Sequence, residues 1–280
     1  MPREAGYAVG SSMLRPRYCS SVNVERSEAP TTKRDPAVVD RRQTLLAGVS
    51  ESSLPPRTMT IAGIEGRIRA RILSTDTRGD ATRLVQIPPG WGTGLVGSFT
   101  AGVEIFVVQG VMTVGRAQVG VLDYVAIPPN RAVSGVRTSS MTLALLMTSG
   151  PIRFEVNAGS GPAQIEVVGG SKLAWQPEDG RPGRYVRSLG VGPRGPVWIG
   201  GAKDWVAGPE HAHSHDHAEE MFVLDGSLSV SEQDGAEVEI FDYEKGGYCF
   251  RPGGRAHGGA GSRCDGTSLA FHRRFSESSL

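Results

Sequence analysis

All six histidines of this 280-residue chain lie in its second half, and four side chains there have the spacing of a metal site. His213 and His215 stand two positions apart, so both imidazoles face the same side of an extended strand. A short turn then brings Glu219 back toward the same point. A Pro-Gly-Gly turn shortly before His257 aims a fourth ligand inward from a distant strand. Three imidazoles and one carboxylate suit zinc, iron, manganese, nickel or copper, so the sequence predicts one divalent-metal site.

The spacing of these residues forms two motifs. The first reads H-x-H-x(3)-E-x(6)-G and the second G-x(5)-P-x-G-x(2)-H, with these members: His213, His215, Glu219 and Gly226, then Gly246, Pro252, Gly254 and His257. The pair resembles the two motifs of the cupin superfamily, and the resemblance covers most of residues 58–272. It implies small jelly-roll barrels and a metal held by the three histidines and Glu219. One departure is Gly261, which stands where cupins often have an asparagine.

Neighbouring polar residues leave alternatives open. Glu220 competes with Glu219 as the ligand, because adjacent strand residues face opposite sides. The six-residue gap to Gly226 favours Glu219. His211 and His217 are placed outside the site, in a histidine-rich tract of the kind that binds metal loosely at a surface. The weak candidates for a catalytic acid or base are Tyr248, Glu220 and His272.

The two halves of the chain repeat each other. VEIFVVQGVMTVG at 103–115 matches EEMFVLDGSLSVS at 219–231, and DYVAIPPNRAV at 123–133 matches GYCFRPGGRAH at 247–257. The second match is offset by eight more residues than the first, which predicts a longer hairpin in the second copy. The 38 glycines and 18 prolines separate short β-type runs, a pattern that predicts an all-β fold. We therefore expect two tandem cupin jelly-roll barrels.

The first copy lacks the metal ligands. Its four equivalent positions are Gly97, Phe99, Val103 and Val133, none of which binds a metal. The sequence therefore predicts a barrel with a structural role, such as supporting the second barrel, covering sheet edges or forming a dimer.

Composition divides the chain into four parts. Residues 1–57 are rich in charged residues, Ser and Pro without periodicity, and are expected to be a disordered or targeting tail. A barrel without ligands is expected at 58–155, a linker and first strand region at 156–183, and the metal-binding barrel at 184–275. Within the tail, two arginines before QTLLAGV faintly resemble a twin-arginine export signal, although the apolar run is too short.

Bulk composition excludes several classes of protein. A formal charge of +1 gives no general attraction to nucleic acid. No run approaches the ~18–20 apolar residues of a membrane span, and three unevenly spaced cysteines do not indicate a disulfide framework. We expect a cytoplasmic protein that binds a small-molecule substrate, without a nucleic-acid or membrane partner. Export through the N-terminal tail and a homodimer stay open.

Three functions compete for the predicted site. We favour an Fe(II) dioxygenase acting on a small oxygen-chelating substrate such as a diketone, hydroxyketone or catechol. A lyase or isomerase would use Zn(II), Mn(II) or Ni(II) as a Lewis acid. The segment AEEMFVLDG is similar to a cupin subgroup that includes zinc-binding anti-sigma factors and 2,4'-dihydroxyacetophenone dioxygenase. The third function, a zinc-binding sensor or binding module, follows from the anti-sigma factors of that subgroup. Fe(II) is the favoured metal, with Zn(II) or Mn(II) as alternatives.

Overall fold

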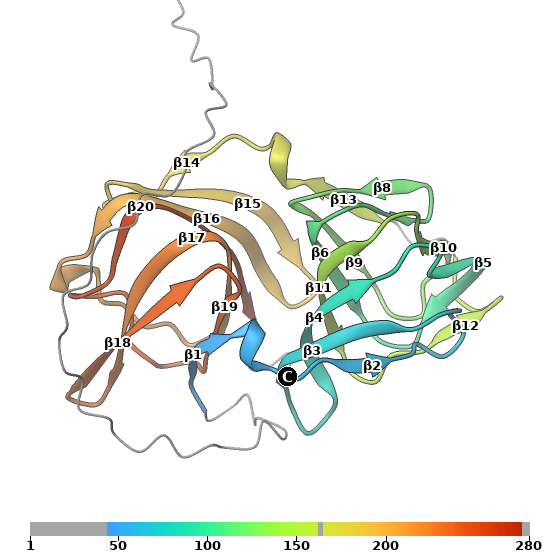
Figure 1. The fold of residues 1–280 in the computed structure, drawn as a ribbon, viewed down its shortest axis with the longest axis horizontal. Coiled ribbons are helices and arrows are strands. Elements are labelled where there is room, and N and C mark those ends of the chain that lie inside the picture. The colour runs from blue at the N-terminus through green and yellow to red at the C-terminus, as the bar shows by residue number, and fades with distance from the viewer. Residues whose placement is uncertain (1–43, 162–164, 276–280) are drawn as a thin grey trace, which may run out of the picture. The chain divides into compact units, whose positions relative to one another are not determined.

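The computed structural model describes residues 44–161 and 165–275, and these ranges are built from strands and turns (Figure 1). Three short 3-10 helices occur among them: η1 (Glu51–Ser53), η2 (Gly170–Lys172) and η3 (Pro209–His211). The described residues include no α-helix. No helix in this part of the chain could therefore cross a membrane. The predicted all-β fold is confirmed.

Two antiparallel sheets form the first barrel. The larger sheet has seven strands, in the order β13 (Glu166–Gly169), β9 (Asp123–Ile127), β6 (Val103–Gln109), β11 (Thr142–Ser149), β4 (Asp80–Ile87), β3 (Ile68–Thr75) and β2 (Arg57–Met59). The smaller sheet has five, in the order β12 (Phe154–Val156), β5 (Gly92–Phe99), β10 (Val133–Thr138), β7 (Met112–Val114) and β8 (Ala117–Val119). The two sheets enclose one apolar core.

A single eight-stranded sheet curls into the second barrel (Figure 1). Its order is β1 (Leu46–Ser50), β19 (Gly247–Arg251), β17 (Ala218–Asp234), β20 (Arg263–Phe275), β16 (Gly195–Val206), β15 (Arg184–Gly192) and β14 (Gln176–Pro177). The eighth strand, β18 (Glu237–Glu244), pairs with the second half of β17.

Strand β1 corrects the expected boundary of the N-terminal tail. Leu46 of β1 pairs with Phe250 of β19, so this strand covers the edge of the second barrel's sheet. Part of the apolar run QTLLAGV forms this edge-covering strand, which protects the unpaired backbone groups of β19. The tail expected at 1–57 is therefore too long at its end. The rest of that expectation, on residues 1–43, lies outside the described residues.

The predicted repeat is visible in the strand register. In the first barrel β6 pairs with β9, with Val103 opposite Ile127. In the second barrel β17 pairs with β19, and Glu219 and Arg251, the equivalent residues of the repeat, stand opposite each other. The additional residues fall in the long β17–β18 hairpin, which stands where the first barrel has the short β7–β8 hairpin. The predicted longer hairpin is confirmed.

Strands at the contact between the two barrels are buried on both faces. On β6, Ile105 belongs to the core of the first barrel and Phe106 to a separate inter-barrel core. On β17, Met221 belongs to the core of the second barrel and Phe222 to the same inter-barrel core. Because successive strand residues face opposite sides, this double burial explains why IFVV and MFVL lack polar residues.

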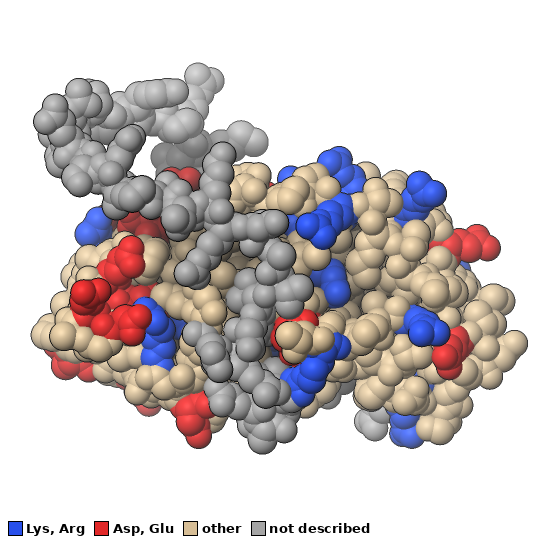
Figure 2. Space-filling view, turned by 90° about the horizontal axis from the view of Figure 1, so that it is seen from below, with Lys and Arg blue, Asp and Glu red and all other residues tan. Residues whose placement is uncertain are grey.

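Charged side chains are unevenly spread over the face shown in Figure 2. Acidic residues gather at the left of this view. Among the strands, β18 exposes four acidic side chains: Glu237, Glu239, Asp242 and Glu244. Lysine and arginine side chains are scattered over the whole of this face. Four arginines gather instead around a cavity of the second barrel.

Candidate metal centre

Backbone hydrogen bonds bring the two predicted motifs together in the second barrel. His213 and His257 form an antiparallel bridge, in which the His213 N–H donates to the His257 carbonyl at 3.1 Å. The His257 N–H donates in return at 2.9 Å, and the Gly254 N–H donates to the His215 carbonyl at 2.7 Å. The Pro-Gly-Gly turn is thereby tied to the histidine-rich segment.

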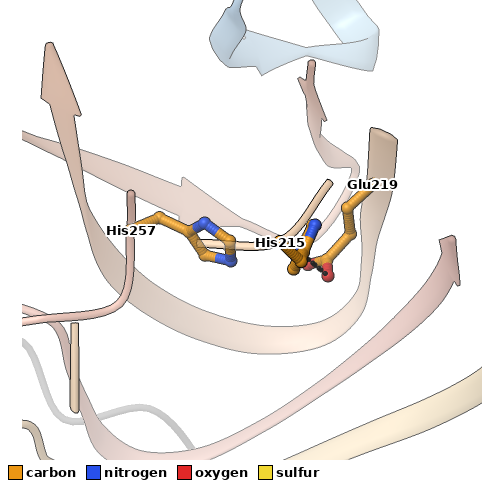
Figure 3. Close-up of side chains that lie close together, drawn as sticks. All are labelled: His215, Glu219 and His257. Carbon is orange, nitrogen blue, oxygen red and sulfur yellow. Dashed lines mark hydrogen bonds and ion pairs between the residues drawn. The ribbon is translucent and has the colours of Figure 1, made fainter. Parts of the chain in front are cut away.

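Three of the four predicted ligands lie close together (Figure 3). One donor atom from each of His215, Glu219 and His257 lies within 4.8 Å of the other two. His215 Nε2 lies 3.2 Å from Glu219 Oε2. Donors bound at about 2.1 Å to one metal ion lie within about 4 Å of each other. Small side-chain rotations would therefore bring the three donor atoms to the separations that a shared metal ion requires.

His213, the fourth predicted ligand, lies beside this group and is not part of it. Its ring centroid is 4.4 Å from that of His257 and 6.2 Å from that of His215. Its Nδ1 lies 3.0 Å from the His211 carbonyl oxygen and 3.0 Å from Arg181 Nη2. The structure thus clusters three predicted ligands and places the fourth next to them.

The three histidine rings share one pattern of contacts. In each, Nδ1 lies beside the backbone carbonyl of a residue two positions away. The distances are 3.0 Å from His213 to His211, 2.7 Å from His215 to His217 and 3.1 Å from His257 to Arg255. An imidazole whose Nδ1–H donates to a carbonyl has its lone pair on Nε2, the arrangement common in metal-bound histidines. The contacts of His215 and His257 fit this tautomer. His213 Nδ1 also faces Arg181 Nη2, which can only donate, so its contacts do not fix the tautomer. The two histidines expected outside the site therefore contribute carbonyls that orient the predicted ligands.

The contact between His215 and Glu219 fits a bound cation. Nδ1 of His215 faces one acceptor, the His217 carbonyl, and Nε2 faces a second, the Glu219 carboxylate. A neutral imidazole has a single N–H and cannot donate to both. The contact between His215 Nε2 and Glu219 Oε2 therefore needs either a second proton on the imidazole or a metal ion between the two atoms. Because the surrounding donors are imidazole nitrogens and a carboxylate, the residues present fit a divalent metal.

Electrostatics favour the protonation states that a metal requires. Burial lowers the pKa of His257 to about 3, and burial also lowers the pKa of His213. Burial pushes the pKa of the Glu219 carboxyl upward, but the hydrogen bond to His215 and neighbouring positive charge hold that pKa well below its usual range. Neutral imidazoles therefore surround an ionised carboxylate, as metal binding needs.

Two arginines flank Glu219, and the spacing of the motifs does not reveal them. Arg251 on β19 and Arg274 on β20 are its cross-strand neighbours. Arg251 Nη1 donates to Oε1 at 3.1 Å, and Arg274 Nε donates to Oε2 at 2.8 Å. Arg251 Nε also donates at 2.6 Å to the buried carboxylate of Glu232. These four residues form a charged cluster that fixes the Glu219 carboxylate.

A cavity of about 300 Å³ adjoins the ligand group. Its lining includes Glu219 and His257 together with Trp198, Trp205 and His272. The rings of Trp198 and His272 stack with centroids 5.0 Å apart and planes 7° apart. His272 Nδ1 lies 3.6 Å from Glu219 Oε1 and has no hydrogen-bond partner among the described residues. Of the three weak catalytic candidates, His272 is the one beside the predicted metal.

Glu220 and Tyr248, the other two weak candidates, lie in the contact between the barrels. The Tyr248 hydroxyl donates to Glu220 Oε1 at 2.7 Å, and Arg273 Nη2 donates to Oε2 at 2.7 Å. Ser74 of the first barrel donates to the same carboxylate at 2.8 Å. Arg273 also reaches Glu104, the repeat equivalent of Glu220, at 2.9 Å. Glu220 thus holds the barrels together on the side of β17 away from the cavity.

The first barrel fills the positions where the second has its ligands. Val133 pairs with Gly97, in the register of the His257–His213 bridge. A Cβ at Gly97 would lie 2.6 Å from the ring of Phe154. A cavity of about 20 Å³ lies in this core. The side chains at the other equivalent positions are all buried: Phe99, Val103 and Val133.

Comparisons with known proteins establish the fold. The scan of family models and the search of curated proteins find no match to the sequence. Among solved structures, a candidate dioxygenase from Nostoc punctiforme matches with a TM-score of 0.70 and 19% identity, over 86% of this chain and 85% of that one. The oxalate decarboxylase–formate complex of Lactobacillus farciminis matches with a TM-score of 0.60 and 14% identity, over 84% and 87%. A Bacillus subtilis oxalate decarboxylase variant gives 0.57 and 10%, over 84% and 78%.

These likenesses and the strand register define the class of protein. The chain has the bicupin fold, two tandem cupin jelly-roll barrels, with a candidate metal-binding group in the second. The cupin subgroup of anti-sigma factors and 2,4'-dihydroxyacetophenone dioxygenase stays a prediction from the sequence, and so does the complete set of four ligands.

Proposed function

We propose that the protein is a metal-dependent dioxygenase that acts on a small, oxygen-rich substrate in the second barrel, with Fe(II) as the favoured metal. The observation that carries this proposal is the cavity beside the ligand group. A structural zinc site has no open position, whereas a catalytic metal keeps at least one position open toward a space for substrate. Four protein ligands leave such a position only on a metal that takes more than four ligands, as Fe(II) does. A volume of about 300 Å³ lies at the lower end of small-molecule pockets.

His213, His215, Glu219 and His257 would hold the metal, which when bound supplies redox or Lewis-acid activation of substrate oxygen atoms. The chain's own residues prepare the surroundings. Arg251 orients the Glu219 carboxylate through its 3.1 Å hydrogen bond. Trp198 and Trp205 contribute apolar surface to the cavity wall.

Proton transfer falls to His272 in this proposal. Its ring is buried and stacked on Trp198, so its orientation is fixed. The residue lines the cavity, and its Nδ1 lies 3.6 Å from Glu219 Oε1 without a hydrogen-bond partner among the described residues. A histidine so placed can hold or release a proton at Nδ1.

A second candidate is a lyase or isomerase that uses Zn(II), Mn(II) or Ni(II) without oxidation. The fold likeness to oxalate decarboxylases supports it. The arginines around the cavity also favour it, because they would stabilise negative charge that develops on a substrate. The same ligands would serve either reaction.

One experiment separates the two candidates. Protein purified without oxygen is analysed for metals, stripped, and reloaded with Fe(II), Zn(II) or Mn(II). Oxygen consumption by the Fe(II) form that depends on a diketone, hydroxyketone or catechol, and that is absent in the Zn(II) form, supports the dioxygenase. Substrate turnover under argon by the Zn(II) or Mn(II) form supports the lyase or isomerase. Protein that binds none of these metals contradicts both.

A further inference from the structure

Two arginines at the cavity wall use only part of their hydrogen-bonding capacity. Arg184 and Arg274 both line the cavity. Arg184 Nε lies 3.4 Å from Glu178 Oε2, and Arg274 Nε lies 2.8 Å from Glu219 Oε2. Within the described ranges, the terminal nitrogens Nη1 and Nη2 of both arginines have no hydrogen-bond partner. Each side chain therefore retains donors for a ligand.

Tryptophan rings support both guanidinium groups. Arg184 Cζ lies 4.9 Å from the ring centroid of Trp205, and Arg274 Cζ lies 5.0 Å from that of Trp198. Both tryptophans line the same cavity. Stacking on an aromatic face restrains the guanidinium plane and leaves its in-plane N–H donors available. The two arginines are thus preorganised for an acceptor with planar geometry.

The cavity also carries an excess of positive charge. Four arginines line it against two carboxylates, those of Glu178 and Glu219. The other two arginines are occupied: Arg181 contacts Glu178 at 2.6 Å, and Arg251 binds Glu219 and a buried carboxylate outside the lining. A divalent ion at the ligand group adds further positive charge. An anion that enters the cavity is therefore attracted.

We propose that the substrate is a small carboxylic acid whose carboxylate is received by Arg184 and Arg274 while its other oxygens face the ligand group. This inference rests on the proposed function, because it takes the metal group as the reaction centre. Guanidinium donors match a carboxylate in a bidentate manner, and such charge-assisted bonds are strong. A 2-oxo or 2-hydroxy acid provides both the carboxylate and the second oxygen within a cavity of this size.

Matched pairs of acid and amide test the proposal. Pyruvate and benzoylformate are each compared with their primary amides, by calorimetric titration into Zn(II)-loaded full-length protein at pH 7. We expect at least one acid to bind ten-fold or more tightly than its amide. In Arg184→Gln and Arg274→Gln that preference falls at least ten-fold. Arg187→Gln is the matched control, since Arg187 also lies over a tryptophan, Trp175, but outside this cavity.

The outcomes separate this inference from the proposed function. Metal content is measured in every variant, and Arg184 touches none of the predicted ligands, so Arg184→Gln reports on the anion alone. Acids that bind no better than their amides, including a lack of binding by both, overturn the inference while a metal-loaded protein leaves the proposed function standing. An unchanged preference in Arg184→Gln and Arg274→Gln, or an equal loss in Arg187→Gln, overturns it as well. A protein that binds no metal refutes the proposed function. The preference for acid over amide can still be measured by titration into the metal-free protein.

Discussion

Glu219 and Glu220 are adjacent on β17, and their carboxylates lie on opposite faces of the strand. Glu219 is grouped with His215 and His257 beside the cavity. Glu220 is buried in the contact between the barrels, where it pairs with Arg273 at 2.7 Å. A single strand therefore connects the candidate metal group with the contact that holds the two barrels together.

Strand β20 repeats this division. His272 and Arg274 line the cavity, whereas Arg273 between them bridges Glu220 and Glu104. Alternation along two neighbouring strands thus explains how one short sequence, HRR, serves both the site and the barrel contact.

Glu220→Gln should keep the metal and lose stability. Glutamine preserves the size of the side chain but removes the charge opposite Arg273, a buried arginine. Removing one partner of a buried ion pair costs about 3–5 kcal/mol. The lower figure is expected here, because Arg273 retains Glu104. Urea unfolding measures the loss, and the exposed Glu239→Gln on β18 should be neutral. A metal-free Glu220→Gln protein would assign Glu220 to the site instead of Glu219.

Gly97→Ala should destabilise the first barrel without changing metal content. An alanine Cβ there lies 2.4 Å from the Glu155 carbonyl oxygen and 2.6 Å from the Phe154 ring. Overpacking of this kind costs about 1–3 kcal/mol. Gly94→Ala, on the same strand β5, meets nothing within 4 Å and should be close to neutral. Equal melting temperatures for the two variants would contradict the claim that this position is filled.

Acid should destabilise the metal-free protein partly through His257. Burial lowers its pKa to about 3 in the folded protein, against about 6.5 in an unfolded chain. Between these values the unfolded chain binds a proton that the folded chain does not, so stability is lost as pH falls from 6.5 toward 3. A gap of about 3.5 pKa units corresponds to at most about 5 kcal/mol. Thermal unfolding of His257→Gln across this range should fall less steeply than that of the metal-free wild type, and parallel curves would count against this account.

Most of what could be predicted from the sequence came from the spacing of the predicted ligands and from the internal repeat. The two-residue step from His213 to His215 and the turn before His257 are properties of the sequence alone, and they identify the segments that meet in the structure. The repeat identified Gly97 and Val133 as the positions of the missing ligands, and their pairing matches that of the second barrel.

Contacts across strands and between barrels were not predictable from the sequence. Arg251 and Arg274 reach Glu219 only because of the register of β19 and β20, and a single sequence does not fix register. The pairing of Glu220 with Arg273 depends on how the barrels pack. The run around Leu46 was misread because its partner, β19, lies about 200 residues further along the chain.

Metal stoichiometry of purified ligand variants tests the central claim most directly. Elemental analysis should give one equivalent of metal per chain for the wild type. His213→Ala, His215→Ala, Glu219→Ala and His257→Ala should each lose most of it, since loss of even a supporting partner commonly lowers affinity by about 10–100-fold. His211→Ala and His217→Ala should retain it, because neither ring supplies a donor to the candidate metal group and the backbone carbonyls that contact His213 and His215 stay in place. Retained metal in His257→Ala, or a loss in His217→Ala equal to that in His215→Ala, would mean that the histidine-rich segment binds metal by itself and that the barrel site is wrong.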